Sequence, residues 1–434
     1  MSLSRHSDTI VAPITAVGGA VAVVRVSGLT AWSVGAAVFS PWPSPVEPHR
    51  AVYGRYSHGD DGLALPFAPG RSYTGEESVE LSVHGSLASV QALASACIEA
   101  GARTAEPGEF TLRAFMNGRM DLTQAEGVRD SVEARTDAQL RQANLLRDGA
   151  LRDQVRAVRE EVVGVLAAVE ASTDFSEEVG ELDRANALHV CSTVRADLLR
   201  LLDAASAARV IREGVSVAIV GLPNAGKSSL LNAVLGSDRA IVTEYPGTTR
   251  DTVEECVSLG GLLVRLIDTA GLRPTDDPVE SFGVERSRFA LENADVVWYV
   301  YDASVGWTPA DEEAWRTIER PAIGVANKSD LASGDHGIEV SATLGTGIPV
   351  LTDVTMGVIG TNEQGALINA RHAPLLQEVL CAIDRAAVTL SQPVPDDLAA
   401  VDLQAAVRAL GEVTGETTPP DIIERIFREF CIGK

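Results

Sequence analysis

The 434-residue sequence predicts a multidomain protein that combines α/β and all-α folds. Residues 1–118 carry short β-branched runs separated by Pro- and Gly-rich turns, which is typical of a mixed α/β domain. Residues 119–211 and 367–434 repeat apolar residues at helical spacing. Strand and helix patterns alternate through residues 212–366, as in a parallel sheet with crossover helices. We therefore expect four segments with these boundaries, the second α/β domain being inserted into a helical bundle.

The composition limits the class of protein. The formal net charge is −24 and 45% of the residues are hydrophobic, which fits an acidic globular chain. No apolar run reaches the roughly 20 residues of a membrane span, and the N-terminus lacks the apolar core of a secretory signal. The 5 scattered cysteines form no CxxC pair, so we expect no disulfide, no zinc site and a cytoplasmic location. The acidity also disfavours broad contact with nucleic acid.

The patterns in residues 1–118 indicate an α/β domain without indicating its function. The expected strands are Thr9–Ala12, Ala20–Ser27, Ala51–Tyr56, Leu63–Phe67 and Ser78–His84, and the expected helix is Leu87–Ala100. Gly101 would end this helix, because glycine adopts the left-handed conformation that closes a helix. The polar, glycine-containing stretch Arg71–Glu77 is expected to be a loop.

Helical periodicity dominates the segments on either side of the second α/β domain. From Asp121 to about Arg209 apolar residues recur every three or four positions, with one break at 174–180. Later helices are expected at Ala370–Leu390, at Leu398–Leu410 and from the N-cap Thr418 onward. Long amphipathic helices bury their apolar stripes in bundles, so we expect the two segments to pack together.

One stretch organises the second α/β domain. The β-branched run 215–220 is followed by Gly221-Leu-Pro-Asn-Ala-Gly-Lys-Ser228, a match to GxxxxGK[ST], and then by an apolar helix. Glycines let backbone N–H groups point at phosphate oxygens, and the helix N-terminus adds its positive dipole end. Lys227 suits the β- and γ-phosphates, and the Ser228 hydroxyl suits Mg²⁺. A chance string is the alternative, but the flanking strand and helix favour a Ras-like P-loop domain.

Two further motifs suit hydrolysis of a bound nucleotide. The stretch 246–251 (Pro-Gly-Thr-Thr-Arg-Asp) offers Thr249 as a second Mg²⁺ hydroxyl on a loop that responds to the γ-phosphate. Asp268-Thr-Ala-Gly271 follows an apolar strand. Its carboxylate can hold the water shell of the metal, and the N–H of Gly271 can reach the γ-phosphate. Together they predict a nucleotide-dependent switch.

The expected base is guanine. Asn327-Lys-Ser-Asp330 follows an apolar strand, and the Asp330 carboxylate can accept two hydrogen bonds from the N1–H and N2–H₂ groups of guanine, which adenine lacks. Ser341 and Ala342 follow a further short strand and would support the O6 edge through a backbone N–H. Each motif alone is also typical of a turn, but their order after successive strands indicates a GTP site. The expected GTP-binding residues are Asn224, Ala225, Gly226, Lys227, Ser228, Ser229, Thr243, Glu244, Tyr245, Pro246, Gly247, Thr248, Thr249, Asp268, Thr269, Ala270, Gly271, Asn327, Lys328, Asp330, Ser341, Ala342 and Thr343.

This set of motifs resembles the translation-factor-like class of GTPases and, within it, the MnmE/TrmE family of tRNA modification GTPases. The resemblance covers almost the whole chain. Outside the nucleotide motifs it is carried by Tyr73–Glu77, Ala105–Phe110, Arg113–Asn117, Asp121–Glu126 and the terminal Phe430–Lys434. It implies that residues 1–118 form a dimerisation and folate-binding domain and that the GTPase domain is inserted into a helical one.

The resemblance implies that K⁺ activates GTP hydrolysis without an arginine finger. The family's potassium positions fall on Asn224, Thr243, Tyr245 and Thr248, and its Mg²⁺ hydroxyls on Ser228 and Thr249. A monovalent cation there would neutralise charge that develops between the β- and γ-phosphates. Glu280 falls where the family has the glutamate that orients the attacking water. The residues alone would make Glu280 a solvated acid at a helix start.

Folate binding is implied for the N-terminal domain. The family's positions for 5-formyl- or methylene-tetrahydrofolate fall on Arg25, Glu80, Arg119 and Lys434, which are otherwise ordinary surface charges. A carboxylate could pair with the pterin N–H edge, and arginines with the folate carboxylates. The chain departs from the family at Ala16-Val17, at His84-Gly-Ser86 and at Arg119, where lysine is common. Cys431 matches the family's tail cysteine and is either a catalytic thiol or an inert one.

The function that the resemblance implies is C5 modification of the wobble uridine (U34) of tRNA by an aminomethyl or carboxymethylaminomethyl group. The expected assembly is a homodimer that joins an FAD- and NADH-dependent partner in a heterotetramer, with no membrane contact. A regulatory GTPase of ribosome assembly would share the nucleotide motifs but should carry a basic RNA-binding appendage. A folate-dependent aminomethyl carrier with a vestigial GTPase domain is a third possibility, which the intact 327–330 motif disfavours.

Overall fold

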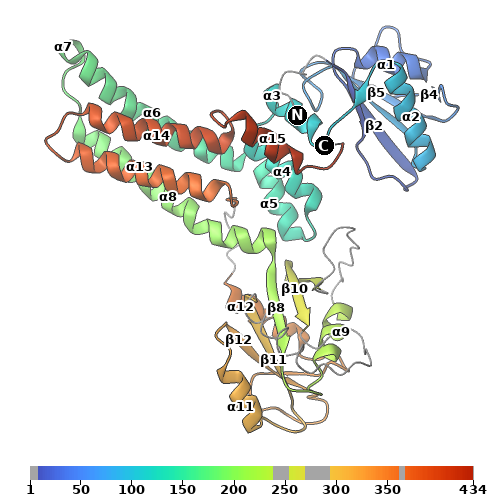
Figure 1. The fold of residues 1–434 in the computed structure, drawn as a ribbon, viewed down its shortest axis with the longest axis vertical. Helices are drawn as coiled ribbons and strands as arrows, with labels where there is room; N and C mark the ends of the chain where they lie inside the picture. Colours follow the sequence, from blue (N-terminus) through green and yellow to red (C-terminus); the bar gives the residue numbers. More distant parts are fainter. Residues whose placement is uncertain (1–7, 238–253, 269–293, 361–366, 434) are drawn as a thin grey trace. The chain divides into compact units, whose positions relative to one another are not determined.

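The computed structural model describes residues 8–237, 254–268, 294–360 and 367–433 (Figure 1). The chain forms two compact units. The first consists of Met1–Arg129, Leu146–Val194 and Glu378–Lys434, and the second of Asp130–Leu145 and Arg195–Gln377. Each unit therefore joins segments that lie far apart in the sequence. Among the described helices, none is both long and apolar enough to cross a membrane.

A seven-stranded sheet forms the N-terminal part of the first unit, in the order β3-β4-β5-β6-β2-β1-β7. Its strands are β1 (Ile10–Pro13), β2 (Val21–Ser27), β3 (Phe39–Ser40), β4 (Val52–Tyr56), β5 (Asp61–Phe67), β6 (Ser78–His84) and β7 (Arg103–Thr104). Helices α1 (Ala31–Val38) and α2 (Leu87–Glu99) cover one face, against which Val24 and Leu81 are fully buried. Because side chains alternate along a strand, the neighbouring Arg25 and Glu80 point to the opposite face.

The C-terminal tail packs against the helix that follows this sheet. Leu112 of α3 (Glu109–Met116), Leu122 of α4 (Leu122–Glu133) and Phe427 of α15 (Pro420–Arg428) share one apolar cluster. Gly108, with φ 70°, permits the close approach, because a Cβ there would lie 2.2 Å from the carbonyl oxygen of Phe427. The tail is therefore part of the first unit's core.

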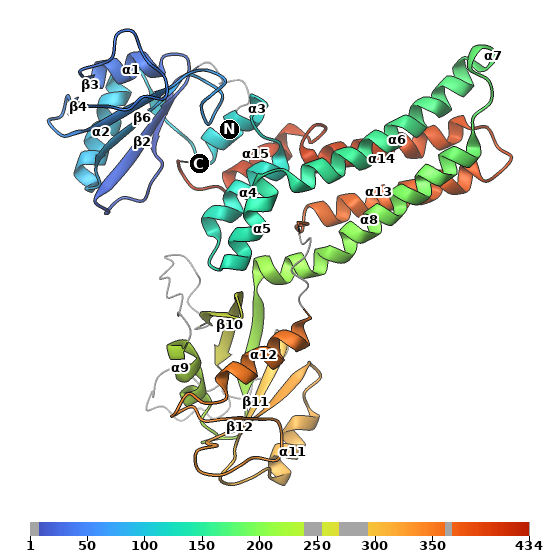
Figure 2. The ribbon, with the colours of Figure 1, turned by 180° about the vertical axis from the view of Figure 1, so that it is seen from behind.

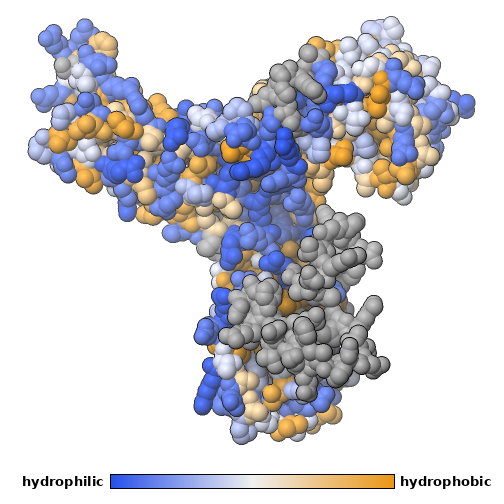
Figure 3. All heavy atoms as spheres, viewed as in Figure 1, coloured by the Kyte–Doolittle hydropathy of each residue, from blue (hydrophilic) through white to orange (hydrophobic). Residues whose placement is uncertain are grey.

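The helical bundle combines segments from before and after the inserted domain. Helices α6 (Ala150–Asp174) and α14 (Asp397–Thr414) lie side by side in both views (Figures 1 and 2). Buried residues recur at helical spacing on both, as at Val158 and Val162 of α6. The other helices of this part are α7 (Ser176–Val179), α8 (Arg184–Glu213) and α13 (His372–Leu390). Polar and apolar side chains are interspersed over the bundle face drawn in Figure 3. The expected insertion into a bundle is confirmed.

A six-stranded sheet forms the second unit, in the order β13-β12-β11-β8-β10-β9. Its strands are β8 (Val215–Val220), β9 (Glu254–Leu259), β10 (Leu262–Asp268), β11 (Val296–Asp302), β12 (Ala322–Asn327) and β13 (Ile338–Val340). Among these, β9 runs antiparallel to β10 and the other neighbours are parallel. Helices α9 (Lys227–Ser237) and α12 (Ile348–Ile359) pack on one face, and α11 (Pro309–Arg316) packs on the other. This is the predicted α/β domain.

Helix α5 (Asp137–Arg147) lies largely in the second unit, although its sequence continues the helical segment. Ala138 shares an apolar cluster with Ile211 of α8 and Leu262 of β10. The Gln139 amide donates to the carbonyl of Arg212 at 3.0 Å. The end of α8 therefore packs with α5 where the chain enters β8.

The structure departs from the expected elements at four places. Helix α15 begins at Pro420, and Thr418 is not its N-cap; its hydroxyl donates to the carbonyl of Glu412 at 2.9 Å. The reason is that Pro419 precedes another proline, which disfavours helical backbone and leaves it extended at ψ 144°. Helices α1 and α3 were not predicted, and the break expected at 174–180 contains α7.

Candidate nucleotide-binding site

The nucleotide motifs within the described residues meet at one edge of the second sheet. Parallel strands place their carboxyl ends together, and the register aligns Asp302 of β11 with Asn327 of β12, and Asn327 with Val340 of β13. Asp268 at the end of β10 pairs with Ile219, next to the start of the phosphate loop. Ligands of open α/β sheets bind at this edge, so the fold positions the site as expected.

The phosphate loop has the backbone that its glycines make possible. Gly221 adopts a φ of 148°, and a Cβ there would lie 2.0 Å from the carbonyl oxygen of Val300. Gly226 adopts a φ of 89°, and a Cβ there would lie 2.2 Å from the amide nitrogen of Asn327. The Lys227 ammonium donates to the carbonyls of Gly221 and Leu222, both at 2.9 Å. The loop thus curls around the ammonium group that is expected to meet the phosphates.

Asn327 joins three of the motifs. Its side chain is 1% exposed, and its amide nitrogen donates to the carbonyls of Ala225 at 3.0 Å and Gly226 at 3.3 Å. Its amide oxygen accepts the backbone N–H of Ala342 at 3.2 Å. Because this amide is buried, breaking any of these hydrogen bonds would leave a polar group unpaired, which is unfavourable. The hydrogen bonds therefore hold the side chain in one position. The phosphate loop and the base-recognition loops are therefore fixed to each other.

The base-recognition carboxylate is oriented by a serine. The hydroxyl of Ser341, which is fully buried, donates to Oδ1 of Asp330 at 2.5 Å and accepts the N–H of Leu344 at 3.2 Å. Asp330 itself is exposed, so its carboxylate faces solvent, where a base could bind. Thr343 and Ser228 are likewise exposed, and the hydroxyl of Ser228 at the start of α9 is of the oxygen type that Mg²⁺ prefers.

A lysine-to-aspartate contact at this edge was missed by sequence reasoning. Lys328 donates through Nζ to Oδ2 of Asp302 at 2.6 Å and to the carbonyl of Asn224 at 3.1 Å. Burial alone would raise the pKa of the Asp302 carboxyl, but hydrogen bonds from Lys328 and Ser304 hold it below its usual value. The only signal in the sequence was an acidic residue, Asp302, at the end of an apolar run.

Several predicted site residues lie outside the described part of the chain. They are Thr243, Glu244, Tyr245, Pro246, Gly247, Thr248, Thr249, Thr269, Ala270, Gly271, Glu280 and Lys434. Asp268 is described through its backbone only. The switch, the water-orienting residue and most of the potassium positions therefore stay predictions.

The structure brings two of the four predicted folate positions together. Arg25 and Glu80 pair in register on β2 and β6, and the guanidinium donates twice to Oε1 of Glu80, at 3.0 and 2.7 Å. The guanidinium also lies over the rings of Tyr73 and Phe110, 4.6 and 5.4 Å from their centroids. Arg119 is exposed, and its side chain lies against Gly75. A charged pair whose side chains are 12% and 23% exposed, beside two aromatic rings, suits a flat, polar ligand.

The tail cysteine is accessible. Cys431 is exposed, and its carbonyl accepts the N–H of Gly108 at 3.3 Å, which anchors the tail backbone. Its exposure permits chemistry with a ligand, but among the described residues no hydrogen bond to its thiol supports a catalytic role.

Two family models match this chain, "MnmE helical domain" over residues 122–431 and "GTP-binding protein TrmE N-terminus" over residues 9–119. The chain belongs to the MnmE family. Curated relatives named tRNA modification GTPase MnmE include those of Synechococcus sp. strains JA-3-3Ab and JA-2-3B'a(2-13), at 42% and 43% identity. Each alignment covers 99% of this chain and 98% of the relative. A solved structure of Aquifex aeolicus Era bound to GDP and AlF₄⁻ is 26% identical, with a TM-score of 0.26, over 42% of this chain and 69% of that one.

Membership of the MnmE family confirms the resemblance and the multidomain fold class inferred from the sequence motifs. The two matched ranges together span the N-terminal domain, the bundle and the inserted domain.

Proposed function

We propose that this chain hydrolyses GTP, with Mg²⁺ and K⁺ bound, during C5 modification of the wobble uridine of tRNA. The observation that carries the proposal is the buried Asn327, which fixes the phosphate loop to the loops that contain Asp330 and Ala342. Membership of the MnmE family makes the chain a GTP hydrolase that takes part in tRNA modification. We further propose a cytoplasmic homodimer that joins an FAD- and NADH-dependent partner as a heterotetramer, with domain boundaries at residues 118, 211 and 366.

The modification function is tested by mass analysis of tRNA nucleosides from cells that lack the protein. We expect wobble uridines without the aminomethyl or carboxymethylaminomethyl group, and restoration when the gene is returned. Unchanged wobble uridines together with defective ribosome subunits would instead support the regulatory GTPase of ribosome assembly. A variant that lacks Lys227 should fail to restore the modification if GTP hydrolysis is needed for it.

We propose that K⁺ binds at Asn224, Thr243, Tyr245 and Thr248 and that Glu280 orients the attacking water. The position of Asn224 in the phosphate loop supports this role, since its backbone is held by Lys328 at 3.1 Å. GTP hydrolysis should be at least about 10-fold faster with K⁺ than with Na⁺, because the cation neutralises developing charge. Glu280→Ala should lower the K⁺-stimulated rate by about 10²-fold and leave GTP affinity almost unchanged. Equal rates in the two salts would contradict the proposed potassium site. Loss of GTP binding in Glu280→Ala would mean that Glu280 has a structural role instead.

We propose that 5-formyl- or methylene-tetrahydrofolate binds at Arg25, Glu80, Arg119 and Lys434, with Cys431 nearby as a candidate catalytic thiol. The half-buried Arg25–Glu80 pair beside two aromatic rings supports this proposal. Glu80→Gln should weaken binding of 5-formyltetrahydrofolate, measured by calorimetry, by about 10-fold or more, since a hydrogen bond to a charged group is lost. Glu47→Gln, in an exposed pair with Arg50, is the matched control and should bind normally. Equal affinity in both variants would rule Glu80 out.

A further inference from the structure

We propose that Asp302 is a positioning residue of the nucleotide site, which acts through Lys328 to hold the phosphate loop in the shape that retains guanine nucleotides. Asp302 can have this role only if the chain binds GTP and GDP as proposed above. The residue lies outside the nucleotide motifs, at the end of β11, and its register partner on β12 is Asn327.

The carboxylate of Asp302 is held in one orientation. Its Oδ1 accepts the backbone N–H of Ser304 at 3.0 Å and the Ser304 hydroxyl at 2.6 Å. Its Oδ2 accepts Nζ of Lys328 at 2.6 Å, and the two side chains are 19% and 34% exposed. Both oxygens are therefore in use, and the ion pair is shielded from water more than a pair on the open surface. Such a carboxylate is preorganised to receive the ammonium group.

The ammonium group of Lys328 connects this carboxylate to the phosphate loop. It donates to the carbonyl of Asn224 at 3.1 Å as well as to Asp302. Asn224 and Lys328 have φ values of 66° and 63°, and among the described residues the only other non-glycine residue with positive φ is His49. Left-handed backbone is unfavourable for residues with a side chain and persists where contacts hold it. The bridge from Asp302 to Asn224 supplies such a contact at both unfavourable positions.

A lysine suits this bridge better than an arginine. The compact ammonium can sit between a carbonyl and a carboxylate, whereas the planar guanidinium prefers paired acceptors. The 36 basic residues of this chain include only three lysines, of which Lys227 lies in the phosphate loop and Lys328 contacts it. Within the described residues, loss of the Asp302 charge would leave Lys328 with the carbonyl of Asn224, so the loop would open more often and nucleotide would leave faster.

The test is the release rate of N-methylanthraniloyl-GDP from the full-length protein with Mg²⁺ present. Asp302→Ala should release it about 5–10-fold faster, and Asp302→Asn, which keeps an oxygen acceptor, about 2–3-fold faster. Lys328→Met should also speed release, and Asp302→Ala should then add nothing further, because both changes remove one interaction. Asp335→Ala, which removes an exposed contact with His336, is the control and should release at the wild-type rate.

Three outcomes would overturn the role of Asp302. The first is wild-type release from Asp302→Ala, and the second is full additivity with Lys328→Met. For Asp302→Asn, a lower melting temperature without nucleotide and unchanged release would also contradict it, since that pattern belongs to a purely structural residue. Failure of the wild-type protein to bind the labelled GDP would instead contradict the proposed GTPase function.

Discussion

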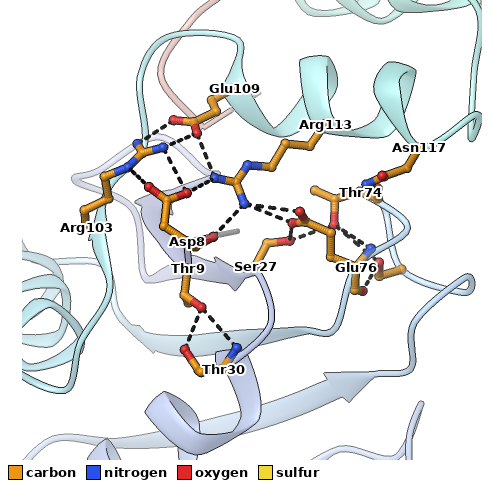
Figure 4. A network of polar contacts seen from close by, with 11 residues as sticks. Asp8, Thr9, Ser27, Thr30, Thr74, Glu76, Arg103, Glu109, Arg113 and Asn117 are labelled. Atoms are coloured by element: carbon orange, nitrogen blue, oxygen red, sulfur yellow. Dashed lines mark hydrogen bonds and ion pairs between the residues drawn. The ribbon is translucent and has the colours of Figure 1, made fainter. Parts of the chain in front are cut away.

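Arg113→Met is expected to lower the free energy of unfolding of the N-terminal domain by about 3 kcal/mol. The guanidinium is 1% exposed and contacts three carboxylates, those of Asp8, Glu76 and Glu109, at 2.7, 3.2 and 2.9 Å (Figure 4). Removing one partner of a buried ionic cluster costs about 3–5 kcal/mol, because the remaining charges lose their compensation. We expect the lower end, because Arg103 still contacts both Asp8 and Glu109.

The pH dependence of this effect follows from the carboxyl groups. Burial pushes the pKa of Asp8 and of Glu109 upward, but hydrogen bonds from Arg103 and Arg113 outweigh it, so both pKa values lie below the ordinary ones. A lowered pKa contributes stability above the unfolded value of about 4, and this stability is lost as the pH falls through the folded value. The difference in the free energy of unfolding between wild type and Arg113→Met should therefore be largest above about pH 5 and should shrink below about pH 4.

Hydrogen–deuterium exchange of peptides from β2 and β6, measured against pH, follows the stability of this domain directly. Arg50→Met is the matched control, because Arg50 and its partner Glu47 are largely exposed, and it should leave exchange unchanged. Wild-type exchange in Arg113→Met would mean that the cluster adds nothing to stability. A loss of stability in Arg113→Met that is constant across the pH range would mean that lost packing of the side chain, not its charge, is responsible.

Sequence reasoning predicted what depends on neighbouring residues. The conformation of the phosphate loop depends on the glycines near Lys227, and that of β6 on the alternation of residues in Ser78–His84. Both elements were therefore predicted with their correct bounds. Helix α3 was missed because it is only 8 residues long and its polar residues Glu109, Thr111 and Arg113 are buried together with its apolar ones. Family resemblance, and not periodicity, related Arg113 to the rest of the N-terminal domain.

Contacts between distant segments could not be predicted from spacing. Asp8, Glu76 and Arg113 are brought together from a strand start, a loop and a helix, and the sequence contains no pattern that links them. Asp302 meets Lys328 for a similar reason, since their contact depends on the register of β11 with β12. The register of the strands and the packing of loops and helices around them therefore determine these contacts, and only a structure supplies both.

Asp330→Asn should change the nucleotide that the chain selects. Guanine offers N1–H and N2–H₂ as two donors to one carboxylate, and hydrogen bonds to charged groups contribute about 1.5–3 kcal/mol each. Losing the charge at Asp330 should therefore cost about 3–6 kcal/mol, or about 10²–10⁴-fold in GTP affinity. Xanthine has an oxygen in place of the 2-amino group, and the amide nitrogen of asparagine can donate to it. Affinity for xanthosine triphosphate should rise as that for GTP falls.

The structure also predicts that the asparagine side chain in Asp330→Asn keeps the orientation of the Asp330 carboxylate. The hydroxyl of Ser341 donates to Oδ1 of Asp330 at 2.5 Å, and an asparagine oxygen can accept the same bond. Ser341→Ala is the matched variant, since it removes the orienting bond and keeps the charge, and we expect only about a 10-fold loss of GTP affinity without a gain for xanthosine triphosphate. Competition binding with both nucleotides distinguishes the two variants. Unchanged GTP selectivity in Asp330→Asn would remove Asp330 from base recognition, and equal losses in both variants would make orientation, not charge, the determinant.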